Sequence, residues 1–171
     1  MSFREAVEKT PGLENAYQIG LQALRARDKP HVDPEDPRGL TGSVDIDTAF
    51  QQSDPQANRW DFGVAYKHSN RANDVIYWLE LHTANDSEIK VVIKKALWRR
   101  GWLNGIGMPL STFERDIVWV SSGPTSITLS APQRKQMAQV GLRYIGRALR
   151  IPTRRANLDC YQRFYCTVVP A

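Results

Sequence analysis

The chain has 171 residues, of which 42% are hydrophobic and 24% are charged, and its formal net charge is +5. This length suits one domain that buries a core without metal or disulfide staples, and the apolar content excludes a disordered chain. No apolar run approaches the ~20 residues that cross a bilayer, and the first residues lack the apolar stretch of an export signal. We therefore expect a cytoplasmic protein without membrane contact.

Apolar residues at helical spacing predict a helix over 5–24, which is interrupted at Pro11-Gly12 and closed by Pro30. Segments rich in alternating, β-branched and aromatic residues then predict three strands. These strands span 42–47, 60–66 and 74–82. A polar link of hairpin length joins the last two, so the three strands should form a meander.

The pattern then changes to a helical period. Asn85 and Glu88 have the spacing of a capping box, and apolar positions recur on one helical face over 88–103. A strand over 116–121, a helix over 132–140 with Ser130 as its N-cap, and a strand over 144–151 follow. The helix between the third and fourth strands predicts a right-handed crossover that places those two strands in parallel.

These elements predict a single α/β domain over 1–171, with a mixed central sheet flanked by helices on both faces. We expect an αβββαβ core over 13–121, followed by a C-terminal helix, a strand and a basic tail over 122–171. The two cysteines of this tail, Cys160 and Cys166, are expected to be free thiols, because the sequence shows no export signal. A Cys pair without a neighbouring His also cannot form a structural zinc site.

Charge is divided unevenly along the chain. Residues 1–89 carry nine Lys/Arg and fifteen Asp/Glu, whereas residues 90–171 carry fourteen Lys/Arg and three Asp/Glu. A carboxylate site for cations beside a surface for polyanions would give this division, and so would chance segregation on a solvated surface.

Acidic side chains gather on the three early strands. Asp45 and Asp47 are two residues apart and should share a face of the first strand. Asp61 opens the second strand, and Glu80 lies in an otherwise apolar run of the third, where an unpaired carboxylate would be costly to bury. Carboxylates that converge from neighbouring strands suit Mg²⁺ or Mn²⁺, so these four residues are candidate metal ligands. The alternative is a set of strand-end acids that face water.

The chain resembles the PD-(D/E)xK nuclease superfamily, which has the restriction-endonuclease-like fold. The resemblance rests on the order αβββαβ, on Asp61, and on Glu80-Leu81-His82 of the third strand. His82 stands where the family has lysine, and Trp60 stands where the family has proline before the Asp.

This resemblance implies a metal-dependent nuclease that hydrolyses phosphodiester bonds in DNA or RNA. Asp61 and Glu80 would hold Mg²⁺ or Mn²⁺, with Asp45 or Asp47 in support. His82 would polarise the attacking water, or Lys94, two turns into the next helix, would take the place of the missing lysine.

The basic half of the chain ends in arginines that alternate with aromatic residues. Arginine binds phosphate through two nitrogens and aromatic rings stack on bases, so this tail is a candidate nucleic-acid surface. The candidate phosphate ligands are Arg147, Arg150, Arg154 and Arg155. A catalytically inactive subunit that uses the same fold to bind nucleic acid or a protein partner is the alternative function, and the missing lysine favours it.

Overall fold

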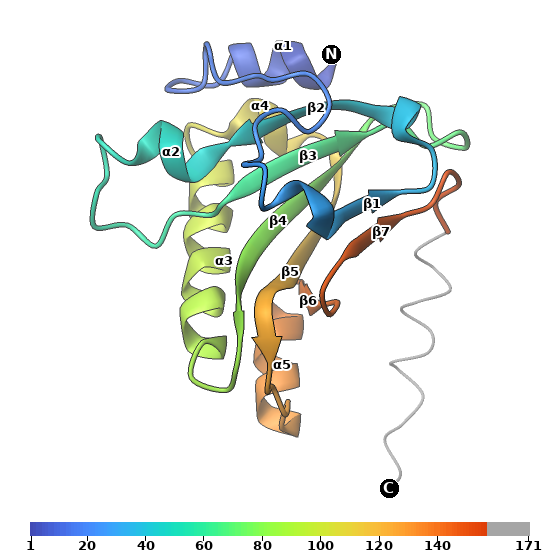
Figure 1. Ribbon diagram of the computed structural model, residues 1–171. Coiled ribbons are helices and arrows are strands. Elements are labelled where there is room, and N and C mark those ends of the chain that lie inside the picture. Colours follow the sequence, from blue (N-terminus) through green and yellow to red (C-terminus); the bar gives the residue numbers. More distant parts are fainter. Residues whose placement is uncertain (157–171) are drawn as a thin grey trace, which may run out of the picture.

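A five-stranded mixed sheet forms the centre of the computed structural model, which describes residues 1–156 (Figure 1). The strands are β2 (Leu40–Asp45), β3 (Phe62–Tyr66), β4 (Val75–Ala84), β5 (Glu114–Thr125) and β6 (Leu142–Tyr144), in that spatial order. The pairs β2–β3 and β3–β4 are antiparallel, whereas β4–β5 and β5–β6 are parallel. The predicted meander, the parallel crossover and the mixed sheet are therefore confirmed.

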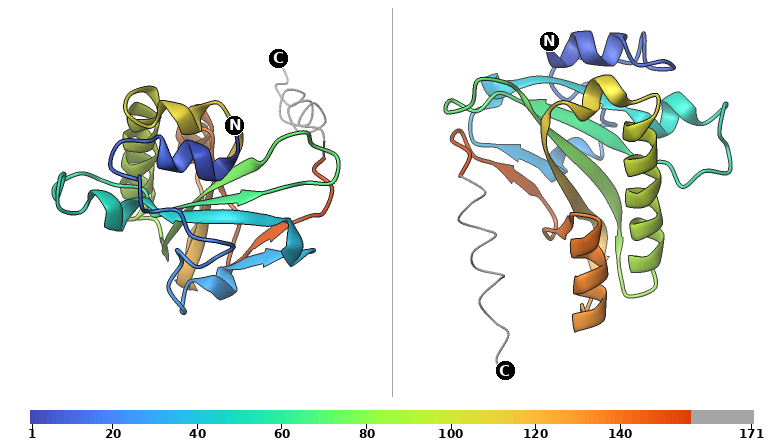
Figure 2. Two further views of the ribbon diagram at one scale, coloured as in Figure 1. Left: turned by 90° about the horizontal axis from the view of Figure 1, so that it is seen from above. Right: turned by 180° about the vertical axis from the view of Figure 1, so that it is seen from behind.

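One face of the sheet packs against the α-helices of the described chain. These are α1 (Phe3–Glu8), α2 (Ile46–Phe50), α3 (Ile89–Asn104), α4 (Met108–Ser111) and α5 (Ala131–Gln139). Each helix contributes buried residues to a core that also contains Trp78 of β4 and Trp119 of β5. Figure 2 shows α3 and α5 side by side over this face in the view from behind.

The opposite face is covered by a small two-stranded sheet. Its strands β1 (Val32–Pro34) and β7 (Leu149–Ile151) pair in parallel, and the 3₁₀ helices η1 (Lys29–His31) and η2 (Pro37–Gly39) flank β1. The expectation of α-helices on both faces is wrong for residues 1–156. Three prolines fall within residues 30–37, and proline cannot continue a helix, so this cover is built from short extended and 3₁₀ segments.

The segment after α1 passes around the edge of the sheet and is not the predicted helix. Leu13 is buried in the core beside the α-helices, whereas Leu24 is buried in the core beneath β1 and β7. Between them Gln18 pairs with Ser43 of β2 through an isolated bridge. The two leucines are thus buried on opposite faces of the sheet, and the chain crosses from the first face to the second in a series of turns.

The two longer helices lie where the sequence predicts them. Ser130 caps α5 through a capping box with Gln133, and Gly141, at a φ of +69°, follows the helix. Only half of the capping box expected before α3 is formed: Asn85 Oδ1 accepts a hydrogen bond from the Glu88 amide at 3.2 Å, whereas the Glu88 carboxylate bonds His82 Nε2 at 2.7 Å instead of the Asn85 backbone. The predicted strand over 144–151 is two strands, β6 and β7, separated by a turn in which Gly146 has a φ of +83°.

A buried arginine fastens the end of the described chain to the sheet. The side chain of Arg155 is 5% exposed, and its Nε lies 2.9 Å from Glu114 Oε1 at the start of β5. Its Nη2 donates a hydrogen bond to Asp116 Oδ1 at 3.1 Å. Burial raises the pKa of the neighbouring Tyr77 to about 12, so this phenol stays neutral beneath the guanidinium.

We expect Arg155→Ala to lower the free energy of unfolding by roughly 2 kcal/mol, because it removes the buried cation that both carboxylates share. The variant leaves Glu114 paired with Arg71 and Asp116 with Arg143. Arg150→Ala, which removes a side chain that is 88% exposed, is the matched control and should change stability by less than about 0.5 kcal/mol. Urea denaturation of both variants measures the difference. Equal stabilities would show that the Arg155 ion pairs contribute nothing.

Candidate active site

Two carboxylates, one directly before β3 and one within β4, meet one lysine of α3 on the face of the sheet that the α-helices cover. The β3–β4 register pairs Phe62 with Leu79, which sets Asp61 opposite Glu80. Lys95 of α3 donates a hydrogen bond to Asp61 Oδ1 at 2.8 Å and a second one to Glu80 Oε1. The structure therefore brings Asp61 and Glu80 together around a shared ammonium group.

Strand alternation explains why Glu80 faces the helix. Trp78 packs in the core beside the α-helices and Leu79 in the core on the other face, so Glu80 points toward α3. Lys95 lies three residues after Val92 and four before Arg99, two buried positions on the face of α3 that meets the sheet. This spacing directs its side chain at Glu80.

The lysine at the centre is Lys95 and not Lys94, which corrects the sequence prediction. Lys94 is exposed, whereas the side chain of Lys95 is only 15% exposed. One residue in a helix turns the side chain by about 100°. Adjacent lysines on this helix therefore point in clearly different directions, and only the second reaches the carboxylates.

The Asp61–Lys95–Glu80 cluster is electrostatically unusual because Glu80 is fully buried. Burial and the nearby Asp61 charge raise the pKa of Glu80 well above its usual value, against the effect of Lys95. Burial also opposes the charged form of Lys95, but Glu80 and Asp61 outweigh it and raise the Lys95 pKa. The ammonium form of Lys95 therefore holds the cluster together.

His82 borders this cluster but does not occupy the position of the missing lysine. Its Nδ1 lies 3.8 Å from Glu80 Oε1, and its Nε2 is held by Glu88 Oε2 at 2.7 Å. The ring is 32% exposed, so one edge is available to solvent. His82 is thus an oriented imidazole beside the carboxylates.

Asp45 and Asp47 do not share a strand face as predicted, because β2 ends at Asp45. The Asp45 carboxylate caps α2, accepting hydrogen bonds from the Thr48 backbone and hydroxyl, each at 2.8 Å. Asp47 lies in the first turn of α2 and pairs with Arg59 at 2.9 Å. Both side chains have local structural partners, which removes the reason for assigning them to a metal.

A polar cavity of about 370 Å³ opens beside Asp61. It lies at the end of the sheet formed by the C-terminal parts of β2, β4 and β5. Open α/β sheets bind ligands at the carboxyl ends of their strands. Its lining residues are Arg25, Arg27, Asp28, His31, Asp45, Asp47, Asp61, Phe62, Leu81, His82 and Ser122. Sequence reasoning missed the first four; the Arg-x-Arg pattern just before Pro30 was the available signal.

The arginines predicted to bind nucleic acid divide into two groups. Arg147, Arg150 and Arg154 are exposed, whereas Arg155 is buried in the ion pairs described above. The assignment of Arg155 to a phosphate is therefore wrong, because its guanidinium is committed to two carboxylates. Cys160, Cys166 and the aromatic residues of the tail lie outside the described residues.

The donor set of the site suits a divalent cation. Glu80 Oε2 is a buried oxygen without a hydrogen-bond partner in the described chain, and Asp61 supplies a second carboxylate. Residues 1–156 contain no group of three or more His, Cys, Asp or Glu side chains that could hold a metal ion. Mg²⁺ commonly uses one or two carboxylates and completes its shell with water and phosphate oxygens, so Asp61 and Glu80 fit this mode.

No protein-family model, no curated protein and no solved structure matches the chain. Within residues 1–156, no helix has the length and apolarity needed to cross a membrane.

The raised pKa of Glu80 predicts a pH-dependent stability. Folding favours the protonated form, so this contribution is present below the unfolded-state pKa and is lost as pH rises through the folded-state pKa. Glu80→Gln removes the titration and leaves Lys95 paired with Asp61. The wild type should therefore lose stability relative to this variant as pH rises from about 4 toward neutrality.

Thermal unfolding across pH measures this difference. Asp54→Asn, which removes an exposed carboxylate, is the control and should follow the wild-type profile. Parallel profiles for wild type and Glu80→Gln would mean that the buried carboxyl does not bind its proton more tightly in the folded protein.

Proposed function

We propose that the protein is a metal-dependent hydrolase of phosphodiester bonds in DNA or RNA. The observation that carries the proposal is the convergence of Asp61, Glu80 and Lys95 beside a polar cavity. Two hard oxygen donors and a cation at one point are what phosphoryl transfer requires, because catalysis there consists of positioning and charge stabilisation. A restriction-endonuclease-like core belongs to this proposal, with Lys95 in the place of the family's strand lysine.

In this proposal Asp61 and Glu80 would hold Mg²⁺ or Mn²⁺, and the ion, when bound, would supply Lewis-acid stabilisation of the negative charge on the phosphate. Lys95 keeps its proton and stabilises the negative charge that develops at phosphorus. Its two present bonds hold the ammonium beside both carboxylates.

His82 is suited to accept a proton at the same site. The Glu88 carboxylate fixes the ring through Nε2, which leaves Nδ1 directed toward Glu80. A carboxylate partner of this kind fixes the orientation and the tautomer of an imidazole. His82 is therefore a positioned general base rather than a substitute for the family's lysine.

The alternative proposal is an inactive nuclease fold that binds nucleic acid or a protein partner. Lys95 occupies the space between both carboxylates and pairs with each of them, as it would in a purely structural cluster. A pure sample that shifts oligonucleotides in a salt-sensitive way but cuts neither plasmid nor single strands with Mg²⁺ or Mn²⁺ would select this alternative.

The adjacent lysines provide a sharp test of the hydrolase. We expect Lys95→Met to reduce Mn²⁺-dependent cleavage of plasmid and single-stranded substrates by at least about 100-fold, because it removes the cation from the site. Lys94→Met removes the same charge from an exposed position and should leave the rate unchanged.

Glu80→Gln provides the second variant if Lys95→Met does not fold, since it keeps the size of the side chain and one oxygen that can accept a hydrogen bond from Lys95. It should also abolish cleavage, through loss of a metal ligand. Wild-type rates in Lys95→Met or in Glu80→Gln would refute the assignment of the active site.

A further inference from the structure

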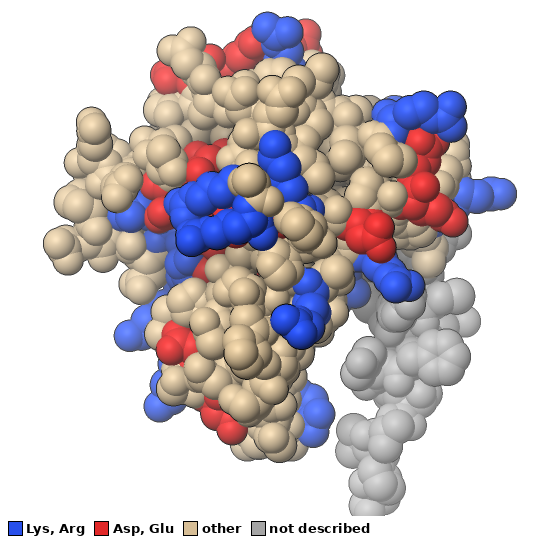
Figure 3. Space-filling view, in the orientation of Figure 1, with Lys and Arg blue, Asp and Glu red and all other residues tan. Residues whose placement is uncertain are grey.

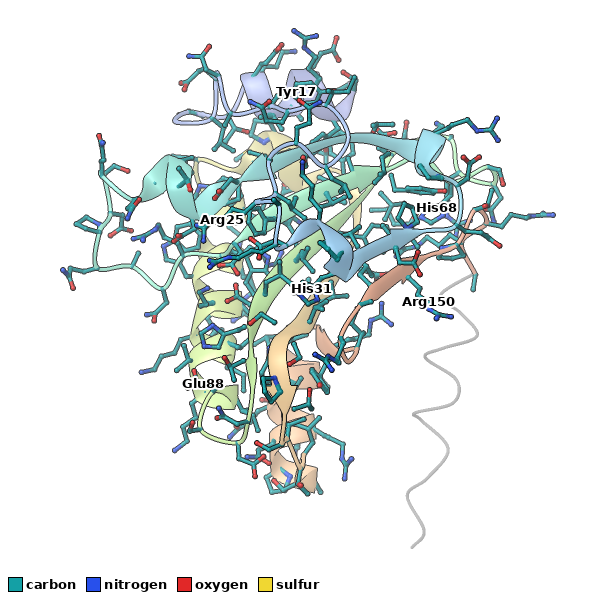
Figure 4. The ribbon with its side chains drawn as sticks, in the orientation of Figure 1. Tyr17, Arg25, His31, His68, Glu88 and Arg150 are labelled. Carbon is teal, nitrogen blue, oxygen red and sulfur yellow. The ribbon has the colours of Figure 1, made fainter. Side chains whose placement is uncertain are left out.

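The cavity beside Asp61 has a basic wall that the proposed chemistry does not use. Arg25, Arg27 and His31 line it from the segment that precedes β1, and the two arginines are exposed. Figure 4 shows Arg25 and His31 on this segment where it crosses in front of the sheet. Figure 3 shows Lys and Arg side chains gathered beside acidic ones over the same face.

The backbone that carries these arginines is fixed on both sides. Leu24 is buried at 3% exposure and Val32 at 5%, both in the core beneath β1 and β7. The Ala23 amide donates to Ser43 Oγ of β2 at 3.1 Å, and the Arg25 carbonyl accepts a hydrogen bond from the Asp28 amide at 2.9 Å. The arginines therefore extend from an anchored turn.

The acidic residues around the cavity do not neutralise the charges of Arg25 and Arg27. Within residues 1–156 the Arg25 side chain makes no hydrogen bond or ion pair, although its charge acts on Asp45 at longer range. Arg27 lies 3.6 Å from Asp28 and is 75% exposed, so water screens that pair. Asp45 and Asp47 are already bonded to Thr48 and Arg59.

We infer that Arg25 and Arg27 form a phosphate clamp that holds a nucleic-acid strand in this cavity. Guanidinium groups bind phosphate oxygens through paired hydrogen bonds, and an anchored turn reduces the ordering that binding requires. Asp61 and His82 line the same cavity as the clamp, so a strand held by the arginines would lie beside these two side chains. The cavity volume of about 370 Å³ is at the small end for ligand pockets.

The inference rests on the proposed function for the identity of the ligand, but its test does not require cleavage. Binding of a fluorescein-labelled single-stranded oligonucleotide of about 12 nucleotides is measured by polarisation, in EDTA, over a series of KCl concentrations. Each lost phosphate contact should reduce the slope of log K against log salt by about 0.7 for a single strand.

We expect Arg25→Ala/Arg27→Ala to reduce this slope by about 1.4 and to weaken binding by at least about tenfold at 0.1 M salt. Arg100→Ala/Arg134→Ala is the matched control, because it removes two exposed arginines on α3 and α5 that do not line the cavity. The control should keep the wild-type slope within about 0.3.

Equal slopes for the two double variants would overturn the clamp, and so would a wild-type protein that does not bind the oligonucleotide. Failure of the clamp is distinguishable from failure of the hydrolase. In the first case wild-type Mn²⁺-dependent cleavage persists and remains sensitive to Lys95→Met. In the second case the salt slope responds to the cavity arginines while no cleavage is seen.

Discussion

The buried carboxyl of Glu80 is the constraint around which this structure is arranged. A fully desolvated carboxylate is tolerated only with a partner cation or with a retained proton. Here Lys95 supplies the cation and also reaches Asp61. The position of α3 over β4 is thereby tied to charge as well as to the packing of its apolar face.

This arrangement has the character of a functional site. An apolar residue at position 80 would continue the run from Val75 to Leu79 and would avoid the desolvation of an ion pair. Retaining a charged cluster next to a polar cavity is a cost to folding that the proposed catalysis or cation binding would explain. In the proposed function, Arg25 and Arg27 in the lining of this cavity would bind the anionic partner of such a cation.

Local sequence signals predicted the central elements well. The strands β3 and β4, the crossover helix α3 and the capped helix α5 each follow from patterns within their own residues, and their arrangement follows from crossover geometry. The same signals placed Asp61 and Glu80 on neighbouring strands. Their convergence needs only the alternation of side chains and the antiparallel register.

The missed features depend on contacts between distant parts of the chain. β1 and β7 have three residues each and exist because they pair with one another across more than a hundred residues. The apolar spacing of 13–24 suited a helix, yet Leu13 and Leu24 are buried on opposite faces of the sheet. Lys94 and Lys95 differ by one helical step, and only the packing of α3 decides which one meets Glu80.

A crystal of the protein soaked in Mn²⁺ tests the central claim most directly, because the anomalous signal of the metal locates it without reference to activity. The account predicts a peak bound by carboxylate oxygens of both Asp61 and Glu80, and no such peak in crystals of Glu80→Gln. A wild-type map without manganese at these residues, with Lys95 still bonded to both carboxylates, would contradict it.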